Sequence, residues 1–111
     1  MGQPVVHADA VHSAVERIAA ILRRIRKPNV ETVILEGEGQ FLLKRIGWHE
    51  GERINNTVVF VRLVNDKIWI EEDWTEEGIA TELLRAGVPR DDIVLAFHPP
   101  QLRHMTEFAS A

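Results

Sequence analysis

The sequence predicts an α+β fold in which two helices pack on one side of an antiparallel sheet. Three observations carry this prediction: an apolar stripe of helical period near the N-terminus, a central series of β-branched segments joined by short turns, and a second, shorter helical stripe. Because a helix must bury its stripe and a sheet its face, the two helices and the sheet are expected to share one core. The 111 residues match the usual size of one domain, here residues 1–111.

A long first helix is predicted over residues 10–27. Apolar side chains recur there at steps of three and four residues, which aligns them on one helical face. The stripe comprises Val11, Val15, Ile18, Leu22 and Ile25. Asp9 is expected to cap the N-terminus, and Pro28 with Asn29 to end the helix. The stripe can cover the sheet or face a second copy of the chain, so a homodimer is the alternative use of this helix.

Four strands are predicted next, over residues 30–35, 40–48, 54–64 and 67–72. The segments between them are short and carry the Gly, Asn, Asp and Glu residues of tight turns. Strands joined by such short turns are neighbours that run in opposite directions. The prediction is therefore a four-stranded antiparallel meander.

A short second helix and a covering C-terminal segment complete the predicted fold. Thr75 is expected to cap the helix, and Glu76 and Glu77 to lie in its first turn. The buried stripe is predicted to be Ile79, Ala80, Leu83 and Leu84, and Gly87 to end the helix. Residues 93–97 are interpreted as a short buried strand or an extended segment packed inward. In the tail, Leu102, Met105 and Phe108 recur every three residues, which predicts a helical turn that packs down on the core.

The composition excludes several classes of protein. There are no cysteines, so disulfides, thiolate metal sites and a cysteine nucleophile are excluded, and a reducing cytoplasm is the expected location. No apolar stretch is long enough to span a membrane, and the N-terminus does not resemble a signal peptide. The net charge of −4 disfavours tight autonomous DNA binding, so DNA contact is expected to be weak or indirect.

The residues that could carry catalysis or bind a metal lack the spacing that such chemistry needs. Neither serine lies in a nucleophile motif, and the glycines do not form a phosphate-binding loop. The histidines lack the spacing of a zinc site, so no metal and no cofactor are expected. These are His7, His12, His49, His98 and His104. The chain is therefore not expected to be an enzyme.

The five carboxylates between residues 71 and 77 can be interpreted in two ways. The favoured reading is that Glu71, Glu72, Asp73, Glu76 and Glu77 satisfy backbone N–H groups at a strand end and helix start and otherwise face water. The alternative is a metal-assisted nuclease, which predicts Mg²⁺-dependent cleavage that is lost on Glu71→Ala.

Two sets of side chains are candidates for binding another macromolecule. Trp74 follows a turn and is expected to be exposed, whereas Trp69 is expected near the core. His98, fixed by the prolines after it, and Arg103 suit either a carboxylate or phosphate of a partner or an internal hydrogen bond to the acidic helix start. The candidate partner-binding set is Trp74, Glu76, Glu77, His98 and Arg103. The candidate basic patch is Arg17, Arg23, Arg24, Arg26 and Lys27, for which a solvated helix face is the favoured reading.

The second half of the chain carries a dense series of short motifs. They are Lys67-Ile68-Trp69-Ile70, Thr75-Glu76-x-Gly78-Ile79-Ala80, Glu82-Leu83, Gly87-Val88-Pro89, Asp92-Ile93-Val94-Leu95, Phe97-His98-Pro99-Pro100, Arg103 and Thr106-Glu107-Phe108-Ala109, with Gly47-Trp48 upstream. With these motifs the chain resembles, over nearly its whole length, the XisI-like family of fdxN element excision controlling factors. Segment 37–41 and Trp74 depart from the family pattern, which affects the expected partner surface and not the fold.

The resemblance implies a non-enzymatic accessory protein for the excision of a DNA element by site-specific recombination in cyanobacteria. Such a protein acts directly with a companion of endonuclease-like fold encoded beside it, and indirectly with a recombinase. It implies no catalytic residue. The alternative function is an antitoxin-like partner that inhibits the companion, for which the acidic residues 71–77 would mimic DNA phosphates.

Overall fold

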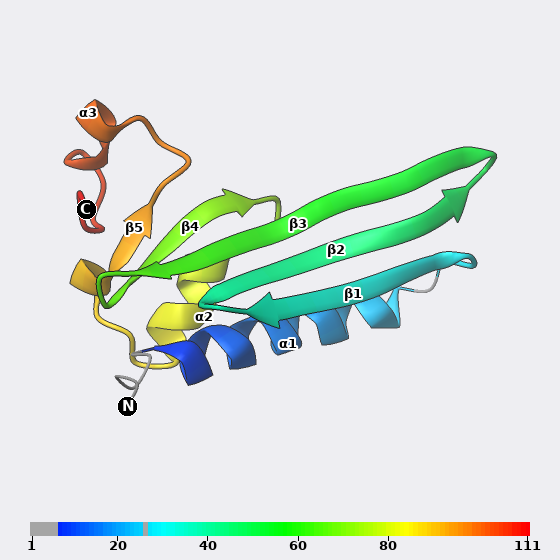
Figure 1. The fold of residues 1–111 in the computed structure, drawn as a ribbon, viewed down its shortest axis with the longest axis horizontal. Helices are drawn as coiled ribbons and strands as arrows, with labels where there is room; N and C mark the ends of the chain where they lie inside the picture. The colour runs from blue at the N-terminus through cyan, green and yellow to red at the C-terminus, as the bar shows by residue number, and fades with distance from the viewer. Residues whose placement is uncertain (1–6, 26) are drawn as a thin grey trace.

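The computed structural model describes residues 7–25 and 27–111, which form a five-stranded sheet with two helices on one face (Figure 1). The elements are α1 (Ala8–Arg24), β1 (Val30–Gly37), β2 (Gln40–His49), β3 (Glu52–Val64), β4 (Lys67–Asp73), α2 (Ile79–Arg85), the 3-10 turn η1 (Arg90–Asp92), β5 (Ile93–Leu95) and α3 (Pro100–Arg103). The predicted α+β fold is confirmed.

The sheet has the order β1-β2-β3-β4-β5. Strands β1 to β4 form the predicted antiparallel meander, and each of its three hairpins turns through two residues with positive φ: Glu38-Gly39, Glu50-Gly51 and Asn65-Asp66. Such turns match the twist of the strands they join. The predicted number of four strands is corrected to five, because residues 93–95 form β5, parallel to β4. A parallel neighbour requires a crossover, which α2 provides.

The first helix lies about one turn nearer the N-terminus than the predicted range 10–27. His7, not Asp9, occupies the N-cap position, with φ 74°, and its Nε2 lies 2.8 Å from Asp92 Oδ2. Asp9 is in the first turn instead, where its charge suits the helix dipole. At the other end, Ile25 already has extended backbone angles, φ −86° and ψ 92°, three residues ahead of Pro28.

The second helix begins later than predicted, because its capping group comes from β4. Gly78 is the N-cap residue, so Glu76 and Glu77 precede the helix. Asp73 Oδ2 accepts the N–H of Ile79 at 2.7 Å. Thr75, the predicted cap, accepts the N–H of Gly78 through its hydroxyl at 3.0 Å. Gly87, with φ 94°, follows the end of the helix as predicted.

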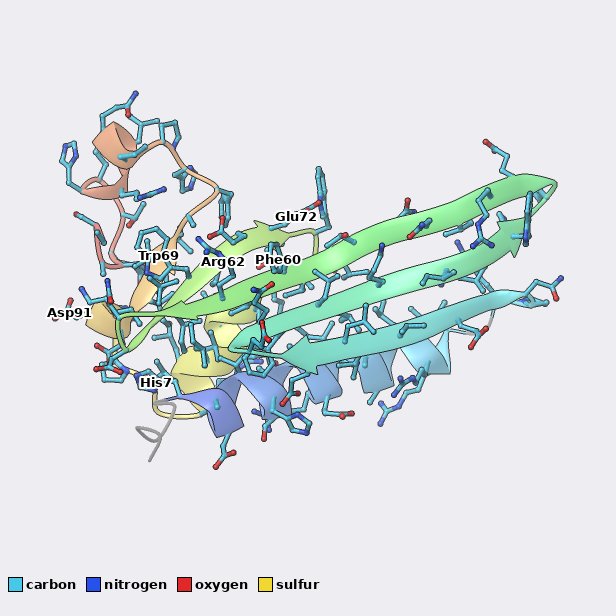
Figure 2. The ribbon with its side chains drawn as sticks, in the orientation of Figure 1. His7, Phe60, Arg62, Trp69, Glu72 and Asp91 are labelled. Carbon is cyan, nitrogen blue, oxygen red and sulfur yellow. The ribbon has the colours of Figure 1, made fainter. Side chains whose placement is uncertain are left out.

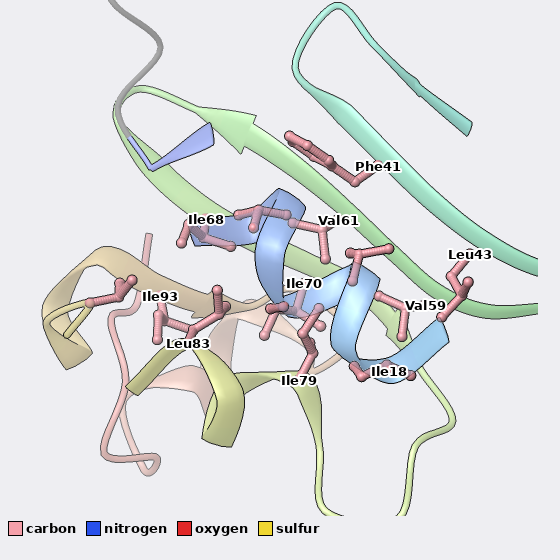
Figure 3. Close-up of a cluster of buried hydrophobic side chains, with 14 of the residues drawn as sticks. Ile18, Phe41, Leu43, Val59, Val61, Ile68, Ile70, Ile79, Leu83 and Ile93 are labelled. Carbon is pink, nitrogen blue, oxygen red and sulfur yellow. The ribbon is translucent and has the colours of Figure 1, made fainter. Parts of the chain in front are cut away.

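Both helices and one face of the sheet enclose a single core (Figure 3). The fully buried side chains include Val11 and Val15 of α1, Leu43 and Val59 of the central strands, and Ile79 of α2. The predicted stripe therefore packs on the sheet from Val11 to Leu22, but the prediction for Ile25 was wrong, because the helix ends before it and its side chain is 57% exposed. In the tail, Phe108 packs against the core, but Leu102 and Met105 are 46% and 75% exposed, so the prediction that all three pack down was wrong. After Leu102 the helix ends within two residues, and the three-residue period does not continue.

Candidate partner-binding groove

Trp74 is an exposed aromatic side chain held in a fixed position. Its side chain is 74% exposed, as expected, at the end of β4. The indole N–H donates to Glu72 Oε2 at 2.6 Å, and the backbone N–H donates to the Val58 carbonyl at 2.8 Å. Glu72 pairs with Phe60 of the neighbouring strand, and Figure 2 shows these two side by side. A rigid exposed aromatic group is typical of a binding surface, because little side-chain entropy is lost on contact.

A groove separates Trp74 from the C-terminal half of α1. Ile21 of α1 and Ile25, the residue after its last turn, are 54% and 57% exposed and form the facing wall. We call this site the Trp74 groove; it has a volume of about 410 Å³. Its main lining residues are Ile21, Leu22, Ile25, Val58, Trp74, Glu76 and Glu77. The groove is therefore apolar at its walls and acidic at one rim.

Asp73 fixes the loop that carries Trp74, Glu76 and Glu77. One oxygen, Oδ1, accepts the backbone N–H of Thr75 at 2.9 Å and its hydroxyl at 2.6 Å, and the other accepts the N–H of Ile79. A carboxylate that accepts several N–H and O–H groups holds the backbone in one conformation. Three of the five predicted partner-binding residues are thereby brought together on this loop.

Several carboxylates in and near the groove are paired with neighbouring cations. Glu71 pairs with Arg62 at 2.8 Å, Glu77 lies 3.3 Å from Arg85, and Glu82 binds Arg17 at 3.0 Å. In the part of the chain that the structure describes, no three His, Asp or Glu side chains are grouped so that they could hold a metal ion. This arrangement supports the capping and surface reading of residues 71–77.

His98 and Arg103 do not line the Trp74 groove. The Arg103 guanidinium donates to the carbonyls of His98 and Ala96 at 3.0 and 3.1 Å, and it lies 5.3 Å from the ring centre of Trp69. The predicted internal hydrogen bond of this pair exists, but it joins Arg103 to backbone carbonyls rather than to the acidic start of the second helix. Arg103 thus ties the C-terminal segment to β4, with Trp69 partly buried beneath it.

The predicted basic patch is divided between two sides of α1. Arg17 is bound to Glu82 of α2, whereas Arg23 donates to the Thr32 carbonyl of β1 at 3.0 Å. Arg24 and Lys27 are exposed, and Arg26 lies outside the described residues. Sequence reasoning missed Ile21, which is off the predicted stripe, and Arg45 of β2, a half-buried residue with a buried Nε atom, which alternates with Phe41 and Leu43.

The fold and the groove define a class of protein. It is a small mixed sheet with helices on one face and an apolar, acid-rimmed groove at the end of its long helix. The chain belongs to the XisI family, whose sequence model, described as XisI protein, matches residues 1–110. No curated protein matches the sequence. Among the described residues, no helix is both long and apolar enough to cross a membrane.

Two solved structures are similar over almost their full length. One is a XisI-like protein from Anabaena variabilis, with a TM-score of 0.73 and 26% identity, covering 91% of this chain and 99% of the other. The second is the fdxN element excision controlling factor XisI from Anabaena variabilis, with a TM-score of 0.66 and 33% identity over 92% of this chain and 99% of the other. These similarities confirm the resemblance stated from the sequence.

Proposed function

We propose that this protein is a controlling factor for the site-specific excision of a DNA element. It acts through protein contacts with a companion of endonuclease-like fold, encoded beside it, and indirectly with a recombinase. It works in the cytoplasm and carries out no catalytic step of its own. The similarity to an fdxN element excision controlling factor supports this role. DNA contact is weak or indirect, in keeping with the net charge of −4.

The observation that carries the proposal is the Trp74 groove. An interface is energetically dominated by a few buried aromatic and apolar residues. Trp74, Ile21 and Ile25 are exposed in the isolated chain around one concave site, and a partner side chain that entered it would bury all three. The acidic rim of Glu76 and Glu77 selects a companion segment that carries Lys or Arg beside its apolar residues.

Copurification with the product of the adjacent reading frame tests the proposal. We expect Trp74→Ala to weaken the complex by about thirtyfold, the effect of losing an interface anchor of ~2 kcal/mol. Trp48→Ala is the matched control, since Trp48 is 54% exposed on the β2–β3 hairpin and outside the groove. Binding should be measured by titration calorimetry, and excision of a reporter element in cells should fall with Trp74→Ala alone. Absence of a complex, or equal effects of both variants, would refute the proposal.

An antitoxin-like function is the second candidate, favoured by the carboxylates that project at the groove rim. Such a surface resembles a row of phosphates and would occupy a cationic DNA-binding site on the companion. Coexpression separates the two functions. Rescue of growth from a toxic companion by the wild-type chain, with loss of rescue on Glu76→Lys, supports inhibition, whereas a harmless companion supports the controlling role.

A further inference from the structure

A second cleft lies at the C-terminal end of α1, on the side of β1. Its volume is about 470 Å³, within the roughly 300–1,000 Å³ of small-molecule sites. The lining includes Leu22, Arg23, Ile25, Lys27, Thr32 and Arg45. Three of these six are cations: Arg23 at the end of α1, Lys27 in the loop after it, and Arg45 of β2. The opposing charge in the lining is a single carboxylate, that of Glu31, so the cleft as a whole is positive.

Arg45 occupies a position on the sheet where a core residue would be expected. Strands β1 and β2 pair without a break from Val30↔Gly47 to Gly37↔Gln40, so the alternation that buries Phe41 and Leu43 continues to Arg45. Arg45 stands between Thr32 of β1 and Asn56 of β3, on the face that α1 covers. Helix α1 ends at Arg24, and the cleft lies at this end, where the helix no longer covers the face of the sheet.

The Arg45 Nε atom is buried and has no hydrogen-bond partner among the described residues. It is the only buried side-chain nitrogen or oxygen in that part of the chain without one. An arginine is always charged in a protein, and a buried N–H left unpaired costs on the order of 1–3 kcal/mol or more. Such a cost is tolerated where the group has a role, and an unpaired donor in a positive cleft is suited to an anion.

Arg23 and Lys27 contribute the other two cations that line the cleft. The Arg23 Nη2 group donates to the Thr32 carbonyl at 3.0 Å, which fixes the guanidinium at the cleft while other donors of its planar fork stay available. Three cations around one cleft favour a doubly charged anion over a singly charged one, since the attraction scales with charge.

We propose that this cleft binds a phosphate group. The phosphate oxygens accept from the guanidinium groups of Arg45 and Arg23, with the Arg45 Nε–H at the inner end of the site, and Lys27 adds an ammonium at the rim. Leu22 and Ile25 form an apolar wall that suits the organic part of a phosphomonoester. The same chemistry is offered by a small phosphomonoester and by a terminal phosphate of DNA. This site is independent of the Trp74 groove, and neither its presence nor its absence bears on the companion.

Nuclear magnetic resonance of the arginine Nε–H groups tests the proposal directly. With inorganic phosphate added at constant ionic strength, the Arg45 signal should shift in a saturable way, and the Arg53 signal, from outside the cleft, should not. Arg45→Met should weaken phosphate binding at least tenfold, with Arg53→Met unchanged. Lys27→Gln, a fully exposed change, should weaken it less and serves if Arg45→Met fails to fold. A linear shift, equal binding of acetate, or unchanged affinity in both cleft variants would overturn the proposal.

The source of the phosphate is determined by two further ligands. Tighter binding of a nucleoside 5′-monophosphate than of inorganic phosphate supports a small phosphomonoester. Tighter binding of a 5′-phosphorylated DNA duplex than of its unphosphorylated form supports a DNA end. If neither ligand binds and the Arg45 Nε–H signal does not shift, the proposed phosphate site is overturned.

Discussion

At Gly47 two backbone segments approach each other closely. A Cβ atom built there would lie 1.8 Å from the Asn29 carbonyl oxygen, which also accepts the N–H of Trp48 at 2.9 Å. The loop between α1 and β1 thus rests directly on the end of β2. Any side chain at position 47 must displace main-chain atoms, because Asn29 contributes backbone rather than a movable side chain.

Gly47→Ala is therefore expected to destabilise the protein by roughly 3 kcal/mol, at the upper end of the range for overpacking. Gly37→Ala is the matched control: it lies at the end of β1, with nothing within 4 Å of the added methyl group, and should change stability by less than about 0.5 kcal/mol. Urea denaturation followed by circular dichroism measures both. Similar midpoints for the two variants would contradict the assigned contact.

His12 forms a titratable contact between α1 and β1. Its Nδ1 lies 2.6 Å from Glu36 Oε1, and this hydrogen bond, followed by the charge of Glu36, raises the pKa of His12 above its ordinary value of 6.5. Because the pKa is raised by folding, the contribution to stability is complete below pH 6.5 and is lost as the pH rises through the folded-state pKa.

A nuclear magnetic resonance titration of His12 checks this sign. Glu36→Gln should bring the pKa of His12 back toward 6.5, and it should remove the extra stability fully below pH 6.5 and progressively less up to the folded-state pKa. Glu16→Gln is the internal comparison, since Glu16 lies 3.7 Å away and has a smaller effect on this pKa. A larger shift from Glu16→Gln than from Glu36→Gln would show that the contact is wrongly placed.

At the level of elements, the start of α2 depends on one carboxylate. Asp73→Ala removes the acceptor for the Ile79 N–H and both contacts to Thr75, so we expect a loss of about 2 kcal/mol, the upper range for a helix cap. Asp73→Asn keeps one oxygen and should cost less. Amide hydrogen exchange should accelerate first in residues 74–82 in Asp73→Ala, and uniform acceleration along the chain would argue against a local cap.

The sequence indicates the elements well where the signal is local. The stripe of α1 as far as Leu22 and the places of the three turns are patterns within a few neighbouring residues, and both are confirmed. The first two turns are tighter than predicted, with two residues each instead of the segments 36–39 and 49–53. The start of α2 was mispredicted because its cap, Asp73, lies six residues before Ile79 on a strand. The cap of α1 was mispredicted because His7 is held by Asp92, from the other end of the chain.

For the candidate site too, at the scale of the whole molecule, the local patterns were predicted from the sequence and the contacts between distant segments were not. Trp74, Glu76 and Glu77 share one loop and were predicted together. Ile21 was not predicted, and Ile25 was predicted as part of the buried stripe, because their exposure depends on where the sheet and α2 stop covering α1 and on where the helix ends. Arg103 was predicted as a binding residue, but its guanidinium is used for internal hydrogen bonds across the C-terminal segment.

Arg103 is thus expected to hold the C-terminal segment against the sheet. Arg103→Ala should speed hydrogen exchange at Ala96 and His98 and along residues 103–109, while β1 to β3 stay protected. Arg103→Lys should not restore protection, because an ammonium cannot reproduce two directed bonds and the stacking on Trp69. Unchanged exchange in the alanine variant would return Arg103 to the set of candidate binding residues.

The parallel pairing of β5 with β4 has a consequence for the order of folding. The meander closes through turns of two residues, so its contacts cost little loop entropy and form early. Strand β5 joins only after the intervening helix has docked, and it leaves the ribosome after the four strands of the meander. Until then β4 is a bare edge, and a nascent chain that stalls before residue 93 offers that edge to other strands.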